Sequence, residues 1–208
     1  MPSDTPRLTD VRLVSSGWIN KYVLTYDLGE GRTIAYESVS RKGPEAYRAA
    51  LEARGAGRPS APDAACIVPQ TADGQLVLIR EFRYPLNSWC VAFPAGLIDP
   101  GEDVADCVDR ELREETGYAL RRDLGDAAIR PLPQAGFSSN GLTDETVHIV
   151  FAQVEKVAEA TPEPSERIEV FLLPIAQVPR FLDENTMPIG TRAQLVLEVF
   201  RRQVEARG

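Results

Sequence analysis

The order of hydrophobic patterns along the 208-residue chain predicts an α+β fold. Three observations predict it: short strand-like runs fill residues 9–40, an acid-rich helix follows the strands of the middle region, and two helices come near the C-terminal end. Strands on both sides of a helix, with further helices after them, are typical of helices packed on a sheet. We therefore expect a helix packed on a mixed sheet, together with a small N-terminal antiparallel sheet.

The composition is that of an ordinary acidic globular protein, with 43% hydrophobic residues and a formal net charge of −8. This charge argues against a nucleic-acid groove or a basic membrane patch. The sequence has no apolar run of about 18 residues and no signal-peptide pattern at its start. Cys66, Cys90 and Cys107 form no CxxC pair and are expected to be buried free thiols. We expect a cytoplasmic protein whose partners include neither nucleic acid nor membrane.

The N-terminal region, residues 1–42, is expected to form the small sheet. Its strands are predicted at residues 11–19, 21–28 and 32–41, and Gly29-Glu30-Gly31 is a hairpin signal between the second and third. Residues 43–63 mix a short Ala-rich helical patch with Gly, Pro and Ser, which indicates a linker or surface excursion. Residues 64–208 are then the main domain.

Within residues 64–208 the expected elements follow in a simple order. Strands are expected at 64–69, 75–82, 89–93, 127–131, 146–154 and 167–173. Helices are expected from Asp103 to Gly117, at 175–184 and at 190–206. In the last helix Leu195, Val196, Val199 and Phe200 are predicted to form one core-facing stripe.

The helix that follows Asp103 carries two glutamates in unusual places. Val104, Val108 and Leu112 form its apolar stripe, and Glu111 and Glu115, one turn apart, project beside or within that stripe. A charge-rich helix is usually a solvated surface. Two carboxylates about 5 Å apart, however, repel by roughly 3 kcal/mol at an effective dielectric constant near 20. Such a pair would hold protons or a cation, and hard oxygen ligands favour Mg²⁺ or Mn²⁺.

The stretch from Gly96 to Tyr118 resembles the signature sequence of the Nudix hydrolases. The match comprises Gly96, Glu102 and the run Arg110-Glu111-Leu112-Arg113-Glu114-Glu115-Thr116-Gly117, and it departs from the family only at Tyr118, where an aliphatic residue is usual. The resemblance implies a Nudix α/β/α sandwich that hydrolyses a nucleoside diphosphate linked to another group. It also implies two to three Mg²⁺ ions, with Mn²⁺ as a possible substitute.

The resemblance gives each residue of the signature a role. The implied metal ligands are Glu111, Glu115, Glu114 as a third carboxylate and the carbonyl of Ala95. The residues implied to brace the loop against the helix are Gly96, Glu102 and Arg110.

Flanking segments resemble the branch that hydrolyses ADP-ribose and nucleotide sugars. They are residues 80–85 (REFRYP), residues 92–96 (AFPAG) and Pro133. The resemblance implies that Trp18, Tyr36 and Glu37 hold the nucleobase, with stacking worth about 1–3 kcal/mol per face. Arg83 and Gly136 are the other implied substrate-binding residues, and the N-terminal sheet is implied to form a homodimer.

A general base must come from outside the signature. Glu166, just ahead of a strand, is the first candidate, and Glu145, after the Gly-, Ser- and Asn-rich loop of residues 135–144, is the alternative. The single histidine, His148, lies in a Val-rich strand and is expected to be structural.

The sequence thus predicts Mg²⁺-dependent hydrolysis of ADP-ribose to AMP and ribose 5-phosphate. A pyrophosphatase for GDP- or UDP-linked hexoses is the alternative within enzymes. A nucleotide-sensing module that binds without cleaving is an alternative from another class.

Overall fold

The computed structural model describes residues 5–58 and 61–207, and the chain forms two compact units. Unit 1 comprises Met1–Asp63 and Gly136–Val147, and unit 2 comprises Ala64–Ala135 and His148–Gly208. Residues 136–147, which the sequence analysis places in the 64–208 domain, therefore group with the N-terminal residues. Among the described residues no helix is long and apolar enough to cross a membrane.

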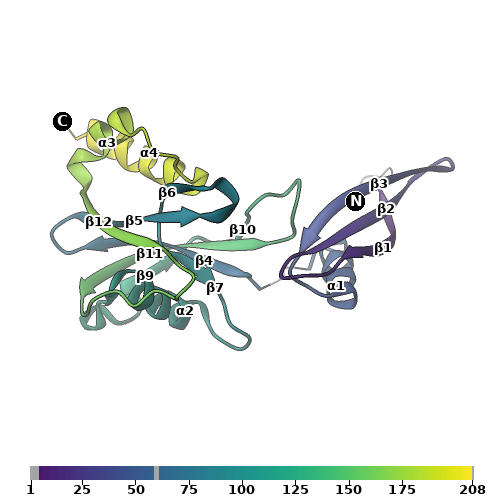
Figure 1. The fold of residues 1–208 in the computed structure, drawn as a ribbon, viewed down its shortest axis with the longest axis horizontal. Coiled ribbons are helices and arrows are strands. Elements are labelled where there is room, and N and C mark those ends of the chain that lie inside the picture. The colour runs from purple at the N-terminus through teal and green to yellow at the C-terminus, as the bar shows by residue number, and fades with distance from the viewer. Residues whose placement is uncertain (1–4, 59–60, 208) are drawn as a thin grey trace. The chain divides into compact units, whose positions relative to one another are not determined.

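Unit 1 contains an antiparallel sheet of β1 (Arg7–Ser15), β2 (Asn20–Gly29) and β3 (Arg32–Ser40), paired in that order (Figure 1). Gly29, Glu30 and Gly31 join β2 to β3, and all three have positive φ angles of 83°, 53° and 74°. The antiparallel pairing of β2 with β3 confirms the hairpin expected from these residues. The two glycines adopt a positive φ angle at little cost.

One face of this sheet is covered by helix α1 (Pro44–Gly55). Tyr22, Leu24 and Tyr47 form a buried cluster in which the rings of Tyr22 and Tyr47 are 4.7 Å apart. The Ala-rich part of residues 43–63, which composition indicates as a linker, is therefore a helix packed on the sheet. A sheet of this size gains stability from such a helix.

The loop of residues 136–147 is held within unit 1 by a cluster of charges. Lys42 Nζ lies 2.7 Å from Asp63 Oδ1 and 3.0 Å from Asp144 Oδ2, and Arg54 Nη1 lies 3.3 Å from the same Asp144 oxygen. Asp63 Oδ2 also accepts a hydrogen bond of 2.8 Å from the Thr146 amide. Asp144 is buried. Composition alone suggests a loop free to close on substrate, but these pairs anchor its C-terminal half.

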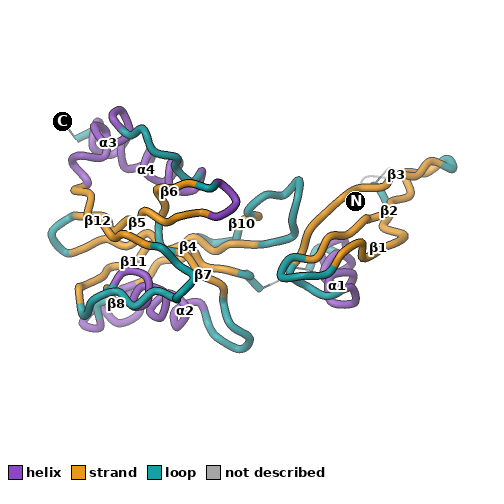
Figure 2. Tube along the Cα trace, in the orientation of Figure 1, coloured by secondary structure: helices purple, strands orange, loops and turns teal. Residues whose placement is uncertain are grey.

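Unit 2 is built on a sheet in which β11, β4, β5 and β12 lie side by side (Figure 2). These strands span Thr146–Lys156, Ala64–Thr71, Gln75–Arg83 and Ile168–Pro174. The shorter strands are β6 (Ser88–Ala92) on β5, β7 (Ala95–Leu97) on β4, and β8 (Tyr118–Leu120) and β9 (Ile129–Pro131) on β11. In unit 1, β10 (Gly136–Phe137) pairs with the first two residues of β11.

Helices cover both faces of the unit 2 sheet (Figure 1). Helix α2 (Val104–Glu111) covers one face, and α3 (Val178–Glu184) and α4 (Thr191–Glu205) cover the other. Short helical turns lie at Tyr84–Leu86, Leu112–Thr116, Arg122–Ala128 and Ile175–Gln177. The core under α2 brings Val108 and Leu112 against Ile67, Val77 and Val150. The α/β/α arrangement that the signature implies is thus confirmed.

The buried face of α4 differs from the expected one. Val196 and Phe200 are buried, but Leu195 and Val199 are 63% and 55% exposed. Because apolar residues occur on more than one side of this helix, periodicity alone does not identify the side that packs. The buried face is completed by Ala193 and Leu197, which lie at helical spacing from Val196 and Phe200.

The three cysteines are free and buried, as expected. Burial raises the pKa of the Cys66 thiol to about 11 and that of the Cys107 thiol to about 12. Neither thiol therefore ionises near neutral pH, which fits residues that pack in the interior.

Candidate active site

The helix of the signature begins and ends where the sequence predicts. The Asp103 side chain caps α2 by accepting hydrogen bonds from the amides of Ala105 and Asp106. After Glu111 the chain widens into a π-helical turn, Leu112–Thr116, and Gly117 ends it with φ = 71°. A widened turn of this kind often marks a functional site. It carries Glu115 one turn beyond Glu111.

Glu111 and Glu115 point into the protein, with exposed fractions of 9% and 3%. Arg110 Nη1 donates to Glu111 Oε1 over 2.6 Å, and the Ala95 amide donates to Glu115 Oε2 over 3.1 Å. Each carboxylate therefore uses one oxygen within the protein. Among the described residues none donates a hydrogen bond to the second oxygen of either.

The negative charges of the Glu111 and Glu115 carboxylates repel each other. Burial raises the pKa of the Glu115 carboxyl well above its ordinary value, and the charges of Glu111, Glu166 and Glu81 raise it further. Burial also raises the pKa of Glu111, although the hydrogen bond from Arg110 partly offsets this effect. Concentrated negative charge with unused oxygen atoms is the environment that a divalent cation stabilises.

Gly96 gives Glu111 the room it occupies. A Cβ at position 96 would lie 1.8 Å from Glu111 Oε1 and 1.9 Å from its carboxyl carbon, distances that no side chain tolerates. The Glu111 carboxylate is therefore packed directly on the backbone of β7, beside the amide that binds Glu115. Only glycine fits this position without moving the carboxylate.

Arg110 links the loop before α2 to the carboxylates. Its Nε and Nη2 donate to the two oxygens of Glu102, each over 2.9 Å, and Nη2 also donates to the Leu97 carbonyl. Glu102 in turn accepts from the Asp99 amide. Glu114, the expected third ligand, is 3.4 Å from Arg110 Nη1 and is the most exposed of the signature glutamates that Arg110 contacts.

No ready-made metal cluster is present: in residues 5–58 and 61–207 no three His, Cys, Asp or Glu side chains are gathered closely enough to hold an ion. The reason lies in the contacts just described. Glu111 and Glu114 are both directed toward Arg110. The Ala95 group that contacts Glu115 is the amide, whereas the resemblance implies a role for the carbonyl.

Two further predicted residues, Glu166 and Arg83, belong to unit 2. Glu166 contributes to the negative potential at both Glu111 and Glu115, and its Oε2 accepts from the Glu163 amide. Arg83 forms an ion pair with Glu81. The sequence analysis missed Glu81, which affects Glu115 electrostatically. Its only sequence signal is alternation along β5, which places it on the same side as Arg83.

The remaining predicted residues belong to unit 1. Trp18 is 77% exposed, and the Tyr36 hydroxyl donates to the Gly141 carbonyl. Because side chains alternate along a strand, Glu37, the neighbour of Tyr36 in β3, points to the other face of the sheet. There it pairs with Lys21 over 3.0 Å. In this part of the described chain Trp18 and Tyr36 make no ring contact with each other.

The other two unit 1 positions lie on the loop. Glu145 is ion-paired with Arg41, and Gly136 opens β10 opposite Val147. The roles that the resemblance implies for all these residues stay predictions.

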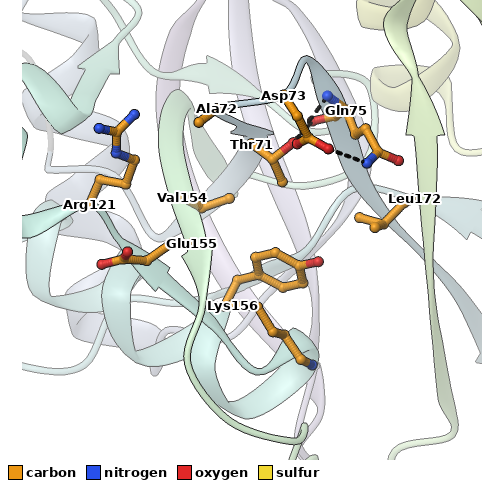
Figure 3. Close-up of a pocket in the computed structure, with 10 residues that line it drawn as sticks. Thr71, Ala72, Asp73, Gln75, Arg121, Val154, Glu155, Lys156 and Leu172 are labelled. Atoms are coloured by element: carbon orange, nitrogen blue, oxygen red, sulfur yellow. Dashed lines mark hydrogen bonds between the residues drawn. The ribbon is translucent and has the colours of Figure 1, made fainter.

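Unit 2 also has a hollow away from the predicted site residues. A cavity of about 470 Å³ is bounded by the turn from Thr71 to Gln75, by Lys156 and Leu172, and by Tyr118 (Figure 3). It contains none of the predicted site residues. Lys156 Nζ lies 5.2 Å from the Tyr118 ring centre and donates to the Thr116 carbonyl. Tyr118, the departure from the family signature, thus lines this hollow.

The Glu102–Arg110 pair predicts a pH-dependent stability. Hydrogen bonds from Arg110 lower the pKa of Glu102 from 4.5 to about 2. Because the folded pKa lies below the unfolded one, the carboxylate stabilises the fold above about pH 4.5 and loses this effect as the pH falls toward 2. Glu102→Gln should lower the free energy of unfolding by about 1–2 kcal/mol at pH 7, after allowance for solvent screening.

Urea denaturation of both proteins between pH 7 and pH 3 measures this difference, which should fall to less than half by about pH 3. Glu159→Gln, at an exposed glutamate of the same unit, is the control and should differ little from the wild type at any pH. A Glu102→Gln deficit that stays constant across the pH range would contradict the prediction.

Comparisons with known proteins agree with this geometry. Residues 60–192 match the NUDIX domain family. The chain is 30% identical over 181 residues to an ADP-sugar pyrophosphatase of Mus musculus, an alignment that covers 80% of this chain and 72% of the relative. It is 32% identical over 105 residues to an ADP-ribose pyrophosphatase of Bacillus subtilis, covering 50% of this chain and 53% of the relative.

A solved structure described as an ADP compounds hydrolase has the same fold, with a TM-score of 0.70 at 24% identity, and the match covers 98% of this chain and 96% of that one. The family match and the buried carboxylates of its signature lead to one conclusion: the chain belongs to the Nudix hydrolase family.

Proposed function

We propose that the protein hydrolyses the diphosphate of ADP-ribose to AMP and ribose 5-phosphate. The observation that carries this proposal is the pair of buried glutamates, Glu111 and Glu115, each with one oxygen left unused. The relatives named above act, by their names, on ADP-ribose and ADP-sugars. This likeness, together with the segment of residues 80–85 that contains Arg83, supports the proposal that this chain acts on similar substrates.

Nudix hydrolases generally depend on divalent metal ions, and we propose two to three Mg²⁺ ions here, with Mn²⁺ as a substitute. Glu111 and Glu115 would hold them, with Glu114 and the Ala95 carbonyl completing the shell. Gly96 supports this fit because it leaves the Glu111 carboxylate on bare backbone. When bound, such ions neutralise the diphosphate and lower the pKa of coordinated water. Glu114 would have to turn away from Arg110 to take part.

The residues of the chain supply the remaining parts of the reaction. Arg83 offers a guanidinium fork to the phosphate oxygens, a geometry suited to phosphate. Glu166 accepts the proton of the attacking water, whose oxygen forms a bond to one phosphorus while the bridging oxygen leaves with the other phosphate. Arg110 keeps Glu111 in place throughout, because it is fixed by both oxygens of Glu102.

We assign the nucleobase to unit 1 and propose that this unit forms a homodimer. Several large apolar side chains of its sheet region are substantially exposed: Leu13, Val14, Trp18, Ile19, Ile34 and Tyr36. Such exposure is typical of a surface that binds another protein. We propose that a second copy of the chain completes the base site beside Trp18 and Tyr36.

Other nucleotide sugars and nucleotide sensing are the alternative functions, and the cytoplasm is the proposed location. GDP- or UDP-linked hexoses share the diphosphate and remain the competing substrates. A nucleotide sensor is disfavoured because Glu102, Glu111, Glu114 and Glu115 are all present. The buried free thiols favour the cytoplasm, where thiols stay reduced.

The substrate assignment is tested by product analysis. With Mg²⁺ and heavy-oxygen water, the protein should convert ADP-ribose to AMP and ribose 5-phosphate faster than it converts UDP-glucose or GDP-mannose. Glu115→Gln should lower kcat by about 10³-fold, because it removes a proposed ligand of the cation. Mass spectrometry of the labelled products locates the attacked phosphorus. Faster turnover of UDP-glucose by the wild type would overturn the assignment.

The choice of base is tested by two matched amide variants. Glu166→Gln should lower kcat by about 10²-fold or more and flatten the acidic limb of the pH–rate profile. Glu145→Gln should stay within about tenfold of the wild type, since Glu145 is engaged by Arg41. The reverse order of effects would give the role to Glu145. Circular dichroism of both variants checks that neither has unfolded.

The homodimer is tested by mass in solution. Light scattering should give twice the chain mass, and Ile34→Asp should shift the protein toward the monomer by placing a charge on the exposed apolar surface. Thr33→Asp, at the neighbouring position on the other face of β3, is the matched control and should leave the dimer intact. A monomeric wild type at micromolar concentration would contradict the proposal.

A further inference from the structure

Strand β5 carries two arginines that point to opposite faces of the sheet. Val77, Glu81 and Arg83 share one face by alternation, and Val77 packs in the core beneath α2. Arg80 lies on the other face, where its guanidinium is 4.5 Å from the Phe171 ring centre and 3.7 Å from Glu169 Oε2. The two arginines therefore have separate surroundings and separate carboxylate partners.

Glu81 is much less exposed than its partner, Arg83. Its side chain is 17% exposed and that of Arg83 is 53% exposed, and Arg83 Nη1 donates to Glu81 Oε1. Glu81 lies in the middle of the sheet, directly opposite Cys90 of β6 and Ile168 of β12. A largely buried carboxylate thus binds one nitrogen of a half-exposed guanidinium.

The position of this pair relates it to the carboxylates of α2. Glu81 and Arg83 share their face of β5 with Val77, which packs against Val108 and Leu112 in the core beneath the helix of the carboxylates. Among the described residues, Glu81 is the one ion-pair partner of Arg83. With only one of its five N–H donors engaged, the guanidinium keeps others for phosphate oxygens.

We propose that Glu81 is a positioning residue that orients Arg83 toward the diphosphate. An unrestrained arginine loses considerable rotamer freedom when it binds phosphate, and a partner that restrains it beforehand reduces this loss. Glu81 acts through its acceptor oxygen, and it does not itself touch the substrate. This inference rests on the proposed hydrolysis of a nucleoside diphosphate compound in the same site.

Two neutral variants separate the acceptor from the charge. Glu81→Gln and Glu81→Met both remove the negative charge near Glu115, but only the amide keeps an oxygen that can accept from Arg83. Glu81→Gln should retain the wild-type KM for ADP-ribose within about threefold, and Glu81→Met should raise KM about tenfold with a smaller change in kcat. Equal impairment of the two variants would overturn the inference.

A double-mutant cycle tests whether Glu81 acts through Arg83. In an Arg83→Ala background, Glu81→Met should change kcat/KM by less than about twofold, because the group that it positions is gone. A tenfold loss in that background would overturn the inference. Glu169→Met, which removes the partner of Arg80 on the other face of the same strands, is the matched control and should leave the kinetics unchanged.

A binding measurement separates this inference from the substrate assignment. If the wild type releases no AMP from ADP-ribose, the proposed substrate is wrong, and calorimetry with inorganic pyrophosphate and Mg²⁺ then replaces the kinetics. Pyrophosphate should bind the wild type and Glu81→Gln alike, and Glu81→Met about tenfold more weakly. Equal binding to all three proteins would overturn the positioning role.

Discussion

The burial of two like charges, one helical turn apart, is the constraint on which the rest of the site depends. Side chains at this spacing are about 5–6 Å apart, and two carboxylates there repel by about 3 kcal/mol at an effective dielectric constant of 20. Burial adds to this cost, since it raises the pKa of Glu115 well above its ordinary value. The fold offsets part of the cost with one hydrogen bond to each carboxylate, and none of the described residues donates to the second oxygen of either.

The surrounding contacts follow from this constraint. Gly96 removes a side chain so that the backbone can approach Glu111, and Arg110 holds the same carboxylate from the other side. Arg110 is itself fixed by both oxygens of Glu102, and Glu102 is fixed by the Asp99 amide. A chain of charge-assisted hydrogen bonds therefore connects the loop before α2 to the Glu111 carboxylate.

The local parts of this arrangement could be predicted from the sequence. The stop at Gly117 and the inward glutamates follow from helical periodicity and from the left-handed residue that ends a helix. The pairing of β5 with β6 and β12, which places Glu81 opposite Cys90 and Ile168, could not, because strand register depends on residues far apart in the sequence. The ion pairs that join Lys42 to Asp63 and Asp144 are equally distant along the chain.

Strand alternation explains why residues close together in β3 and in β5 have different surroundings. In β3, Tyr36 and Glu37 face opposite sides of the sheet, so one chain presents the aromatic ring and the carboxylate in different directions. In β5, Arg80 and Arg83 do the same, and only Arg83 shares a face with the core beneath α2. The amino-acid composition of these segments does not distinguish Arg80 from Arg83, although the two side chains lie on opposite faces of the sheet. Because successive residues of a strand face opposite sides of the sheet, one surface is reached only by every second residue.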